Sequence, residues 1–300
     1  MNGAWNEGPR HWRDKAISWG AKRIVRPLLA APIPWSIHRA GFALGGILRL
    51  RARGVKTHET TLARMRVLIH TPPSPKRRLV WVHGGGFVVG SPQTHRAMCT
   101  HLARALDAVV IAPSYRLAPE NPFPAGFEDV LRAVGEAESV RPELGPLILA
   151  GDSAGGCLVM AALAARLRAG ANFSAVLLSS PASYVDPERE PAENRNDLLF
   201  PLTILQRIAR DYIGDGDPDD PRLSPAAADF TGAPPTLIHC VEGEYLEEDS
   251  DRLADALRAS GAEVTVEKAR LVPHAFHYMA GASPRADAAI ARMAEFLDAI

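Results

Sequence analysis

A serine flanked by glycines is the first feature of this sequence that could carry out chemistry. Gly151-Asp152-Ser153-Ala154-Gly155 follows the apolar run Leu147–Ala150 and opens the helical pattern Ala154–Ala169. A sharp strand-to-helix turn that presents a serine hydroxyl needs small residues on both sides, because the chain passes close to its neighbours there. An ordinary glycine-rich turn has a similar composition, but the position between a strand and a helix favours a nucleophilic serine.

A second glycine motif lies upstream. His83-Gly84-Gly85-Gly86 follows the apolar run Leu79–Val82. Attack of a serine on a carbonyl develops negative charge on the oxygen, which preorganised backbone N–H donors stabilise. Glycines let such donors approach without obstruction by side chains. A flexible loop or a phosphate-binding turn is the alternative, but the G-x-G-x-x-G spacing and the Walker lysine are absent. The two motifs together indicate acyl-transfer chemistry.

A nucleophilic serine needs a general base, and the base needs an orienting acid. His274 lies in Pro273–His277, after a strand that begins at Val264, and is the predicted base. The acid is expected directly after the predicted strand Thr236–Val241, where the candidates are Glu242, Glu244, Glu248 and Asp249. This gives the order serine, acid, histidine along the chain. The other histidines considered, His95, His101, His239 and His277, are interpreted as core or surface residues.

The elements that must position these residues alternate from about residue 65 onward. Predicted strands are Met65–Ile69, Leu79–Val82, Ala108–Ala112, Leu147–Ala150, Ala175–Leu178, Thr236–Val241 and one starting at Val264–Val266. Predicted helices are His95–Leu106, Phe123–Glu138, Ala154–Ala169, Leu246–Ser260 and Arg285–Leu297. Such alternation predicts an α/β fold with a mostly parallel sheet covered by helices on both faces.

Two segments interrupt this alternation. Residues 1–50 and 183–215 are predicted to form two parts of a helical cap over the carboxyl ends of the strands, which leaves 51–182 and 216–300 as the core. The tryptophans Trp12, Trp19 and Trp35 lie in the first segment and are expected to pack against a partner surface.

Charge is balanced overall but not along the chain. The 34 basic and 34 acidic side chains cancel, so binding to nucleic acid is not expected. Residues 1–80 nevertheless contain 16 Lys and Arg against 3 Asp and Glu. A solvated basic face on N-terminal helices is the simpler interpretation. A surface that meets lipid or an acidic partner is the alternative.

Cysteine usage and hydropathy limit the class of protein further. Cys99, Cys157 and Cys240 are odd in number and form no C-x-x-C pair, so buried reduced thiols are expected. No segment resembles a signal peptide, and the apolar stretch Gly41–Leu50 is too short to span a bilayer. We therefore expect a cytoplasmic protein without stable membrane insertion. The acidic loop with Asp215, Asp217, Asp219 and Asp220 is interpreted as a solvated turn, and no metal or cofactor is expected.

On these motifs the sequence resembles the hormone-sensitive-lipase family of bacterial esterases over roughly residues 60–300. The matching stretches are His83–Gly86, Tyr115–Glu120, Gly151–Gly156, Leu223–Pro225 and the segment around His274. The resemblance implies an α/β-hydrolase fold with a helical cap, and oxyanion donors at Gly84, Gly85 and Ala154. It also implies that Tyr115–Glu120 packs and fixes a loop.

The sequence departs from this family at the acid. The family pattern is Asp-x-Leu-x-Asp, and alignment of Leu246 without a gap places Glu244 at the catalytic position. A glutamate can serve, because orienting an imidazole requires a carboxylate within hydrogen-bond reach. Glu242, Glu248 and Asp249 would then lie on the loop rim or at the exposed start of a helix.

The expected function is hydrolysis of short-chain carboxylic esters through an acyl-enzyme on Ser153, with His274 as base and Glu244 as acid. An amidase or deacetylase with the same residues is the nearest alternative. A non-enzymatic small-molecule receptor of this fold is disfavoured, since Ser153 and His274 are both present. The expected partner is a small-molecule ester, and a homodimer is compatible with the sequence.

Overall fold

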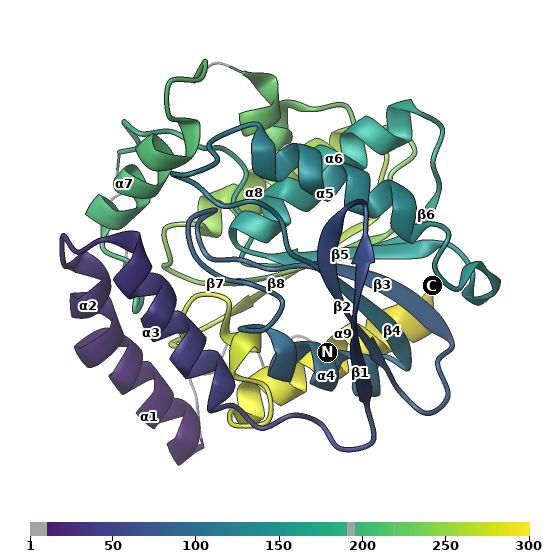
Figure 1. The fold of residues 1–300 in the computed structure, drawn as a ribbon, viewed down its shortest axis with the longest axis horizontal. Coiled ribbons are helices and arrows are strands. Elements are labelled where there is room, and N and C mark those ends of the chain that lie inside the picture. Colours follow the sequence, from purple (N-terminus) through teal and green to yellow (C-terminus); the bar gives the residue numbers. More distant parts are fainter. Residues whose placement is uncertain (1–10, 191–195, 219) are drawn as a thin grey trace.

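An eight-stranded sheet forms the centre of the computed structural model, which describes residues 11–190, 196–218 and 220–300 (Figure 1). The strands are β1 Lys56–Leu62, β2 Met65–Thr71, β3 Arg77–Val82, β4 Ala108–Pro113, β5 Leu147–Asp152, β6 Phe173–Ser179, β7 Thr236–Val241 and β8 Val264–Ala269. Their spatial order is β1-β2-β4-β3-β5-β6-β7-β8. β2 runs antiparallel to β1 and β4, whereas the remaining neighbours are parallel, so the predicted mostly parallel sheet is confirmed.

Helices cover both faces of the sheet, because alternate side chains of each central strand point to opposite sides. On β3, Leu79 and Trp81 join one apolar cluster, while Val80 and Val82 join the other. The first cluster packs beneath α4 (Arg96–Ala105) and α9 (Pro284–Ala299), and the second beneath α5 (Ala125–Ala137), α6 (Ala154–Arg168) and α8 (Glu247–Ala259). Short 3₁₀ turns lie at Pro142–Leu144, Pro221–Leu223, Pro225–Ala227 and Phe276–Met279. All five predicted helices are present.

The edges of the sheet differ from the prediction. β1 was not predicted, because its sequence KTHETTL contains no apolar run and most of its side chains are exposed at the sheet edge. The strand predicted at Met65–Ile69 is present as β2, but it is antiparallel to both of its neighbours. β8 is half-buried, since it lies at the other edge of the sheet.

The described parts of the two segments outside the alternation contain helices, and these helices contact each other. The first contains α1 (Trp12–Gly20), a π-helical turn (Ala21–Val25), α2 (Arg26–Ala30) and α3 (Trp35–Ile47), and the second contains α7 (Leu202–Ile213). Figure 1 shows α1, α2 and α3 together at one side of the molecule, with α7 beyond α2. Trp35 is buried there, and its indole Nε1 donates to Asp211 on α7 at 2.5 Å.

Several smaller expectations can be compared with the structure. The three cysteines are buried and free, as predicted. Across the described residues, no helix is long and apolar enough to cross a membrane, and no group of three or more His, Cys, Asp or Glu could hold a metal ion. Asp219 lies outside the described residues. Asp220 accepts the Arg222 N–H at 2.9 Å and begins a 3₁₀ turn.

Candidate active site

Ser153 occupies the turn between β5 and α6, as the sequence predicts. Its backbone has φ 53° and ψ −123°, a conformation that L-residues adopt only under strain. The Ser153 N–H donates to the Ser179 carbonyl at 2.9 Å, and the Ser153 carbonyl accepts the Ala182 N–H at 3.1 Å. A Cβ at Gly155 would lie 2.1 Å from the Val82 carbonyl oxygen, so the motif requires glycine there. The elbow is held by the adjoining strands rather than by its own sequence alone.

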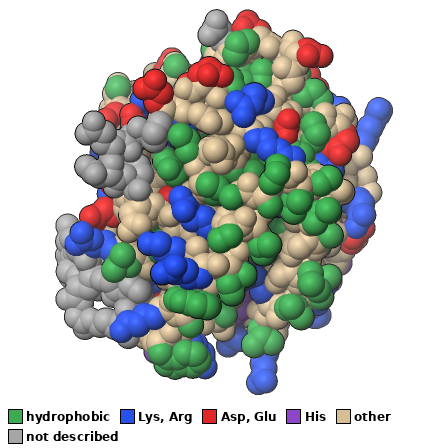
Figure 2. All heavy atoms as spheres, turned by 90° about the vertical axis from the view of Figure 1, so that its left-hand side faces the viewer, with side chains coloured by type: hydrophobic (Ala, Val, Ile, Leu, Met, Phe, Trp, Pro, Cys, Tyr) green, Lys and Arg blue, Asp and Glu red, His purple; other side chains and the backbone are tan. Residues whose placement is uncertain are grey.

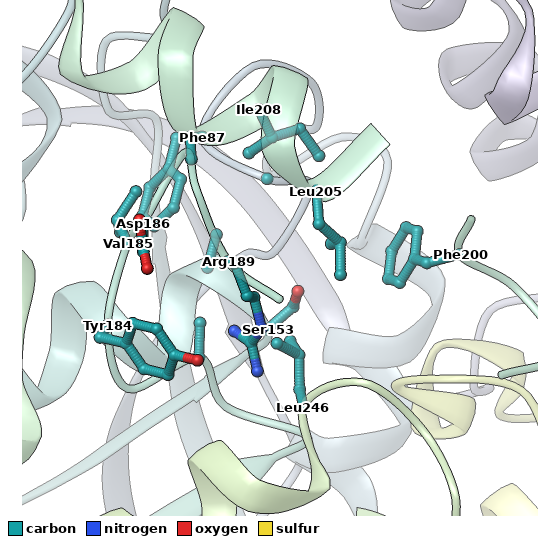
Figure 3. Close-up of a pocket in the computed structure, with 14 residues that line it drawn as sticks. Phe87, Ser153, Tyr184, Val185, Asp186, Arg189, Phe200, Leu205, Ile208 and Leu246 are labelled. Atoms are coloured by element: carbon teal, nitrogen blue, oxygen red, sulfur yellow. The ribbon is translucent and has the colours of Figure 1, made fainter. Parts of the chain in front are cut away.

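The Ser153 side chain opens into a small pocket of about 50 Å³ (Figure 3). Ser153 itself is only 8% exposed, so its hydroxyl is covered rather than free at the surface. Leu205 extends from α7 toward Ser153. The lining residues are Gly86, Phe87, Ser153, Ala154, Ala182, Tyr184, Val185, Asp186, Arg189, Phe200, Leu205, Ile208, Ala209 and Leu246. The segment 183–215 thus supplies much of this lining, and residues 12–50 supply none of it.

The glycine loop after β3 lies against the elbow after β5, because these two strands are parallel neighbours. A Cβ at Gly84 would lie 2.3 Å from the Asp152 carboxylate, which shows how closely the two loops approach. Gly85 has φ +118°, and a side chain there would meet the Val89 carbonyl. Ala154 is the first residue of α6, so its N–H is one of the helix N-terminal donors without an intrahelical acceptor. The three predicted oxyanion donors therefore come from two adjoining loops.

Tyr115 holds the glycine loop in place through contacts with His83. Its hydroxyl donates to the His83 carbonyl at 2.9 Å, and the two rings stack with centroids 4.3 Å apart. Glu120 forms a 2.7 Å ion pair with Arg39 of α3, which also donates to the Val88 carbonyl at 2.7 Å. The predicted packing role of the segment that begins at Tyr115 is confirmed, and α3 contributes to the same brace.

Glu244 and His274 form a buried pair. Their side chains meet at 2.7 Å between Glu244 Oε2 and His274 Nδ1, and the other Glu244 oxygen accepts the Val241 N–H at 3.0 Å. Burial opposes protonation of the imidazole, but the Glu244 carboxylate outweighs it and raises the pKa of His274. His274 Nε2 is buried and has no hydrogen-bond partner among the described residues. That nitrogen is free to accept a proton from a substrate or a serine.

Two of the other acidic candidates pair elsewhere at the surface. Glu242 contacts Arg270 at 2.8 Å, and Glu248 contacts Arg252 at 2.7 Å, with each of these four side chains about half exposed. This agrees with the predicted positions on the loop rim and the exposed helix start.

Asp249 does not lie where it was predicted. It is fully buried instead of exposed at the start of α8, and its carboxylate pairs with Arg189 and accepts the Ser183 N–H at 2.8 Å. The reason is a tertiary contact, because Arg189 comes from a segment 60 residues earlier and needs a buried counter-charge. Arg189 also donates to the Tyr245 carbonyl and lines the pocket, a position that the sequence did not predict.

The carboxyl end of β6 joins the elbow to the histidine loop. Ser179 accepts the elbow N–H, and its neighbour Ser180 accepts the Ala275 N–H at 3.3 Å. Phe200 lines the pocket of the elbow serine, and its ring centroid lies 4.8 Å from that of His274. The nucleophile candidate and the buried pair therefore belong to one site.

Asp197 is a further site residue that sequence reasoning missed. Its Oδ1 accepts the N–H groups of Leu199 and Phe200 at 2.7 and 2.8 Å, and its Oδ2 accepts the Tyr245 N–H at 3.1 Å. It therefore ties the segment that carries Phe200 to the loop that carries Glu244. A carboxylate that accepts N–H groups two and three residues later is a common turn signal, which could have indicated this role.

Asp152 belongs to the serine motif but was given no role from the sequence. It accepts the Trp81 indole N–H at 2.9 Å and contacts His95 Nε2 at 3.4 Å. Burial favours its neutral form, yet His95 and Trp81 together lower the pKa of Asp152. This network anchors the elbow to β3 and α4.

The remaining histidines agree with their interpretation as core or surface residues. His95, His239 and His277 are buried, and His239 and His277 share a 2.8 Å hydrogen bond. His277 also contacts Ser179 Oγ at 2.6 Å. His101 is half-buried and contacts the Leu50 carbonyl.

Comparison with known proteins places this site in a family. A family model described as the alpha/beta hydrolase fold matches residues 79–278. An acetyl-hydrolase of Streptomyces hygroscopicus is 36% identical over 224 residues, which are 74% of this chain and 75% of that protein. The crystal structure of an esterase from the bacterial hormone-sensitive lipase family has a TM-score of 0.85 and 29% identity, over 95% of this chain and 97% of that chain. The chain belongs to the hormone-sensitive-lipase family of α/β-hydrolase esterases.

A further solved structure of similar shape was obtained after a soak with p-nitrophenyl butyrate. It is that of EstE5, with a TM-score of 0.84 and 29% identity over 96% of this chain and 98% of that chain. Membership of the family makes this chain a carboxylic ester hydrolase in the broad sense.

Proposed function

We propose that this esterase hydrolyses short-chain carboxylic esters through an acyl-enzyme on Ser153, with His274 as general base and Glu244 as the orienting acid. The observation that carries the proposal is the buried Glu244–His274 pair beside the strained serine elbow, with His274 Nε2 unpartnered among the described residues. A serine, an imidazole and a carboxylate in these roles are sufficient for nucleophilic acyl transfer.

In the first half-reaction the Ser153 oxygen attacks the ester carbonyl carbon, and its proton passes to His274 Nε2. The resulting imidazolium is stabilised by the Glu244 carboxylate at Nδ1. When the tetrahedral intermediate collapses, the bond to the alcohol oxygen breaks, and His274 returns the proton to the departing alcohol. Water then repeats the sequence on the acyl-serine, which releases the acid and restores the hydroxyl.

Negative charge on the carbonyl oxygen is assigned to backbone donors at Gly84, Gly85 and Ala154. Gly84 lies against Asp152, the residue before the nucleophile, and Ala154 follows the nucleophile and adds the partial positive charge of the α6 N-terminus. No side chain has to move to supply these donors.

The pocket supports a preference for a short acyl chain. Its volume of about 50 Å³ and its closure by side chains such as Leu205, Ile208 and Phe200 leave little space beyond Ser153. The segments 1–50 and 183–215 act as a cap in this proposal, the second by lining the pocket and the first by bracing α7. The soak of EstE5 with a butyryl ester concerns a relative, and it supports the choice of a short acyl group here.

The test is a series of p-nitrophenyl esters from acetyl to palmitoyl, combined with labelling by a fluorophosphonate. We expect the highest kcat/KM on short acyl chains and labelling of the wild type but not of Ser153→Ala. Faster turnover of palmitoyl than of butyryl esters would contradict the chain-length proposal. Labelling of Ser153→Ala would contradict the nucleophile, and faster cleavage of p-nitroacetanilide than of the acetyl ester would indicate an amidase.

A further inference from the structure

The N-terminal helices carry most of the exposed large apolar side chains. Of the twelve among the described residues, ten lie between residues 12 and 50, and the most exposed are Trp12, Trp19, Leu44, Ile47, Leu48 and Leu50. Trp12 and Trp19 are 69% and 62% exposed, although the sequence led us to expect that they would pack. Apolar surface concentrated in so short a segment is unusual for a surface that meets only water.

This exposure is not the result of loosely attached helices. The inner side of α3 packs closely on the body, since a Cβ at Gly46 would lie 2.7 Å from the Thr94 Cα. Two residues after α3, Arg49 donates to the Tyr278 carbonyl at 2.9 Å. The inner side of α1 is fixed by Asp14, which accepts the Ser283 hydroxyl at 2.6 Å. Both helices are thus anchored with their apolar outer sides facing away from the core.

On each helix the exposed apolar residues recur at helical spacing. Trp12 and Trp19 are seven residues apart on α1. On α3, Leu44 follows Ile37 by seven residues, and Ile47 follows Leu44 by three. These intervals place each set on one side of its helix.

Basic residues lie among the apolar ones, and the segment itself contributes almost no acidic residues, although Arg39 pairs with Glu120 of the core. Residues 11–53 contain nine Lys and Arg and one acidic residue, Asp14, which is buried. Lys15 and Arg23 are exposed. Figure 2 looks onto this side of the molecule and shows hydrophobic and Lys or Arg side chains over its lower half, whereas Asp and Glu lie mainly in the upper half.

We propose that the outer sides of α1, of the π-helical turn that follows it and of α3, termed the N-terminal face (Trp12, Lys15, Trp19, Arg23, Leu44 and Ile47), dock on an anionic membrane surface. Tryptophan prefers the boundary between headgroups and acyl chains, and basic residues are attracted to anionic headgroups. Docking of this kind is peripheral and agrees with the lack of a membrane-spanning helix among the described residues.

A second copy of the chain fits this face less well. A two-fold dimer would place the same patch on both partners and bring Lys15 and Arg23 against a surface that carries the same positive charge. Acidic side chains that could neutralise them are missing from 11–53 apart from buried Asp14. An anionic lipid surface supplies that charge.

The test measures co-sedimentation of the full chain with vesicles of phosphatidylcholine alone or with one-third phosphatidylglycerol. We expect binding to the anionic vesicles only, and weaker binding as salt is raised. Lys15→Glu/Arg23→Glu and Leu44→Ser/Ile47→Ser should each weaken binding by at least about tenfold. Lys56→Glu/Arg168→Glu makes the same charge change at exposed sites outside the N-terminal face and should leave binding within about twofold of the wild type.

Hydrolysis of a water-soluble ester and the melting temperature show that each variant is folded, because none of these residues lies in the catalytic machinery. Wild-type protein that fails to bind anionic vesicles would overturn the proposal. So would binding that the N-terminal variants leave unchanged. Sedimentation equilibrium tests the alternative, in which a second copy of the chain binds this face. If the wild type forms a dimer that Leu44→Ser/Ile47→Ser abolishes, and the protein binds no vesicles, the face belongs to a dimer interface.

Discussion

The carboxyl end of the sheet and the N-terminal helices represent opposite ways of placing side chains. At the sheet, polar groups such as Glu244, His274 and Asp152 are buried, and each has specific partners from neighbouring strands. On α1 and α3, apolar groups such as Trp12 and Leu44 are exposed although the helices beneath them are fixed. Buried polar groups that are preorganised suit chemistry, whereas exposed apolar groups suit contact with something outside the molecule.

Loss of the nucleophile should have the largest effect of any change at the sheet. Ser153→Ala should lower kcat on a p-nitrophenyl ester by about 10⁴-fold or more, because the covalent step is removed. The fold should persist, since the substitution deletes one oxygen at a small pocket. Circular dichroism and thermal melting provide the control. Comparable turnover by a folded variant would remove Ser153 from the mechanism.

Loss of the negative charge of Glu244 should cause the second-largest fall in kcat. Glu244→Gln keeps the shape but no longer stabilises the imidazolium, so kcat should fall by about 10³-fold with KM little changed. Glu244→Asp keeps the charge with shorter reach and should be milder. Glu242→Gln and Glu248→Gln are matched controls, since those side chains pair with Arg270 and Arg252 instead. If Glu242→Gln or Glu248→Gln lowers kcat as much as is expected for Glu244→Gln, the acid has been misassigned.

Substitution of Asp249 should reduce stability much more than it reduces catalysis. Asp249→Asn leaves the buried Arg189 guanidinium without its counter-charge, so the free energy of unfolding should fall by about 3 kcal/mol. Urea unfolding measures this change. At temperatures where the variant is folded, kcat should decline far less than in Glu244→Gln. An unchanged unfolding midpoint would show that the pair does not stabilise the fold.

Removal of residues 1–45 should affect activity more than the core. The truncation deletes Arg39, which braces the glycine loop, and Trp35, which holds α7 over the pocket. We expect kcat/KM to fall by about tenfold, because the pocket is less well closed and excludes water less well. The same assay across acyl chain lengths tests the cap. Full activity of the truncated protein with unchanged chain-length preference would show that the N-terminal helices do not act as part of the cap.

The smallest predicted effect is a shift in pH dependence. His274 accepts a proton as its neutral form, so kcat/KM should rise as pH increases through its pKa and be lost as pH falls below it. Glu244 raises that pKa, which places the midpoint above the ordinary histidine value. In Glu244→Gln the midpoint should move to lower pH. A pH profile of kcat/KM for both proteins checks the direction, and an unchanged midpoint would argue against the coupling.

The sequence was informative where local rules govern structure. Buried strands such as β3 and β5 contain continuous apolar runs, and the glycines around Ser153 are needed by the turn itself, so both could be predicted. β1 could not, because an exposed edge strand has no apolar run and is stabilised by pairing with β2. The turn that Asp197 caps is local, but its contact with Tyr245 could not be predicted, since Tyr245 is 48 residues away.

What the sequence determined by itself was the fold class, the elbow at Ser153, the glycine loop and a histidine after the last strand, because each depends on periodicity or on backbone freedom within a few residues. The tertiary structure decided which acid meets His274. Parallel pairing of β7 and β8 brings Glu244 to 2.7 Å from the imidazole, while Asp249 turns inward to a distant arginine. It also decided that Trp12 is exposed, since an apolar side chain is buried only if another part of the chain comes to cover it.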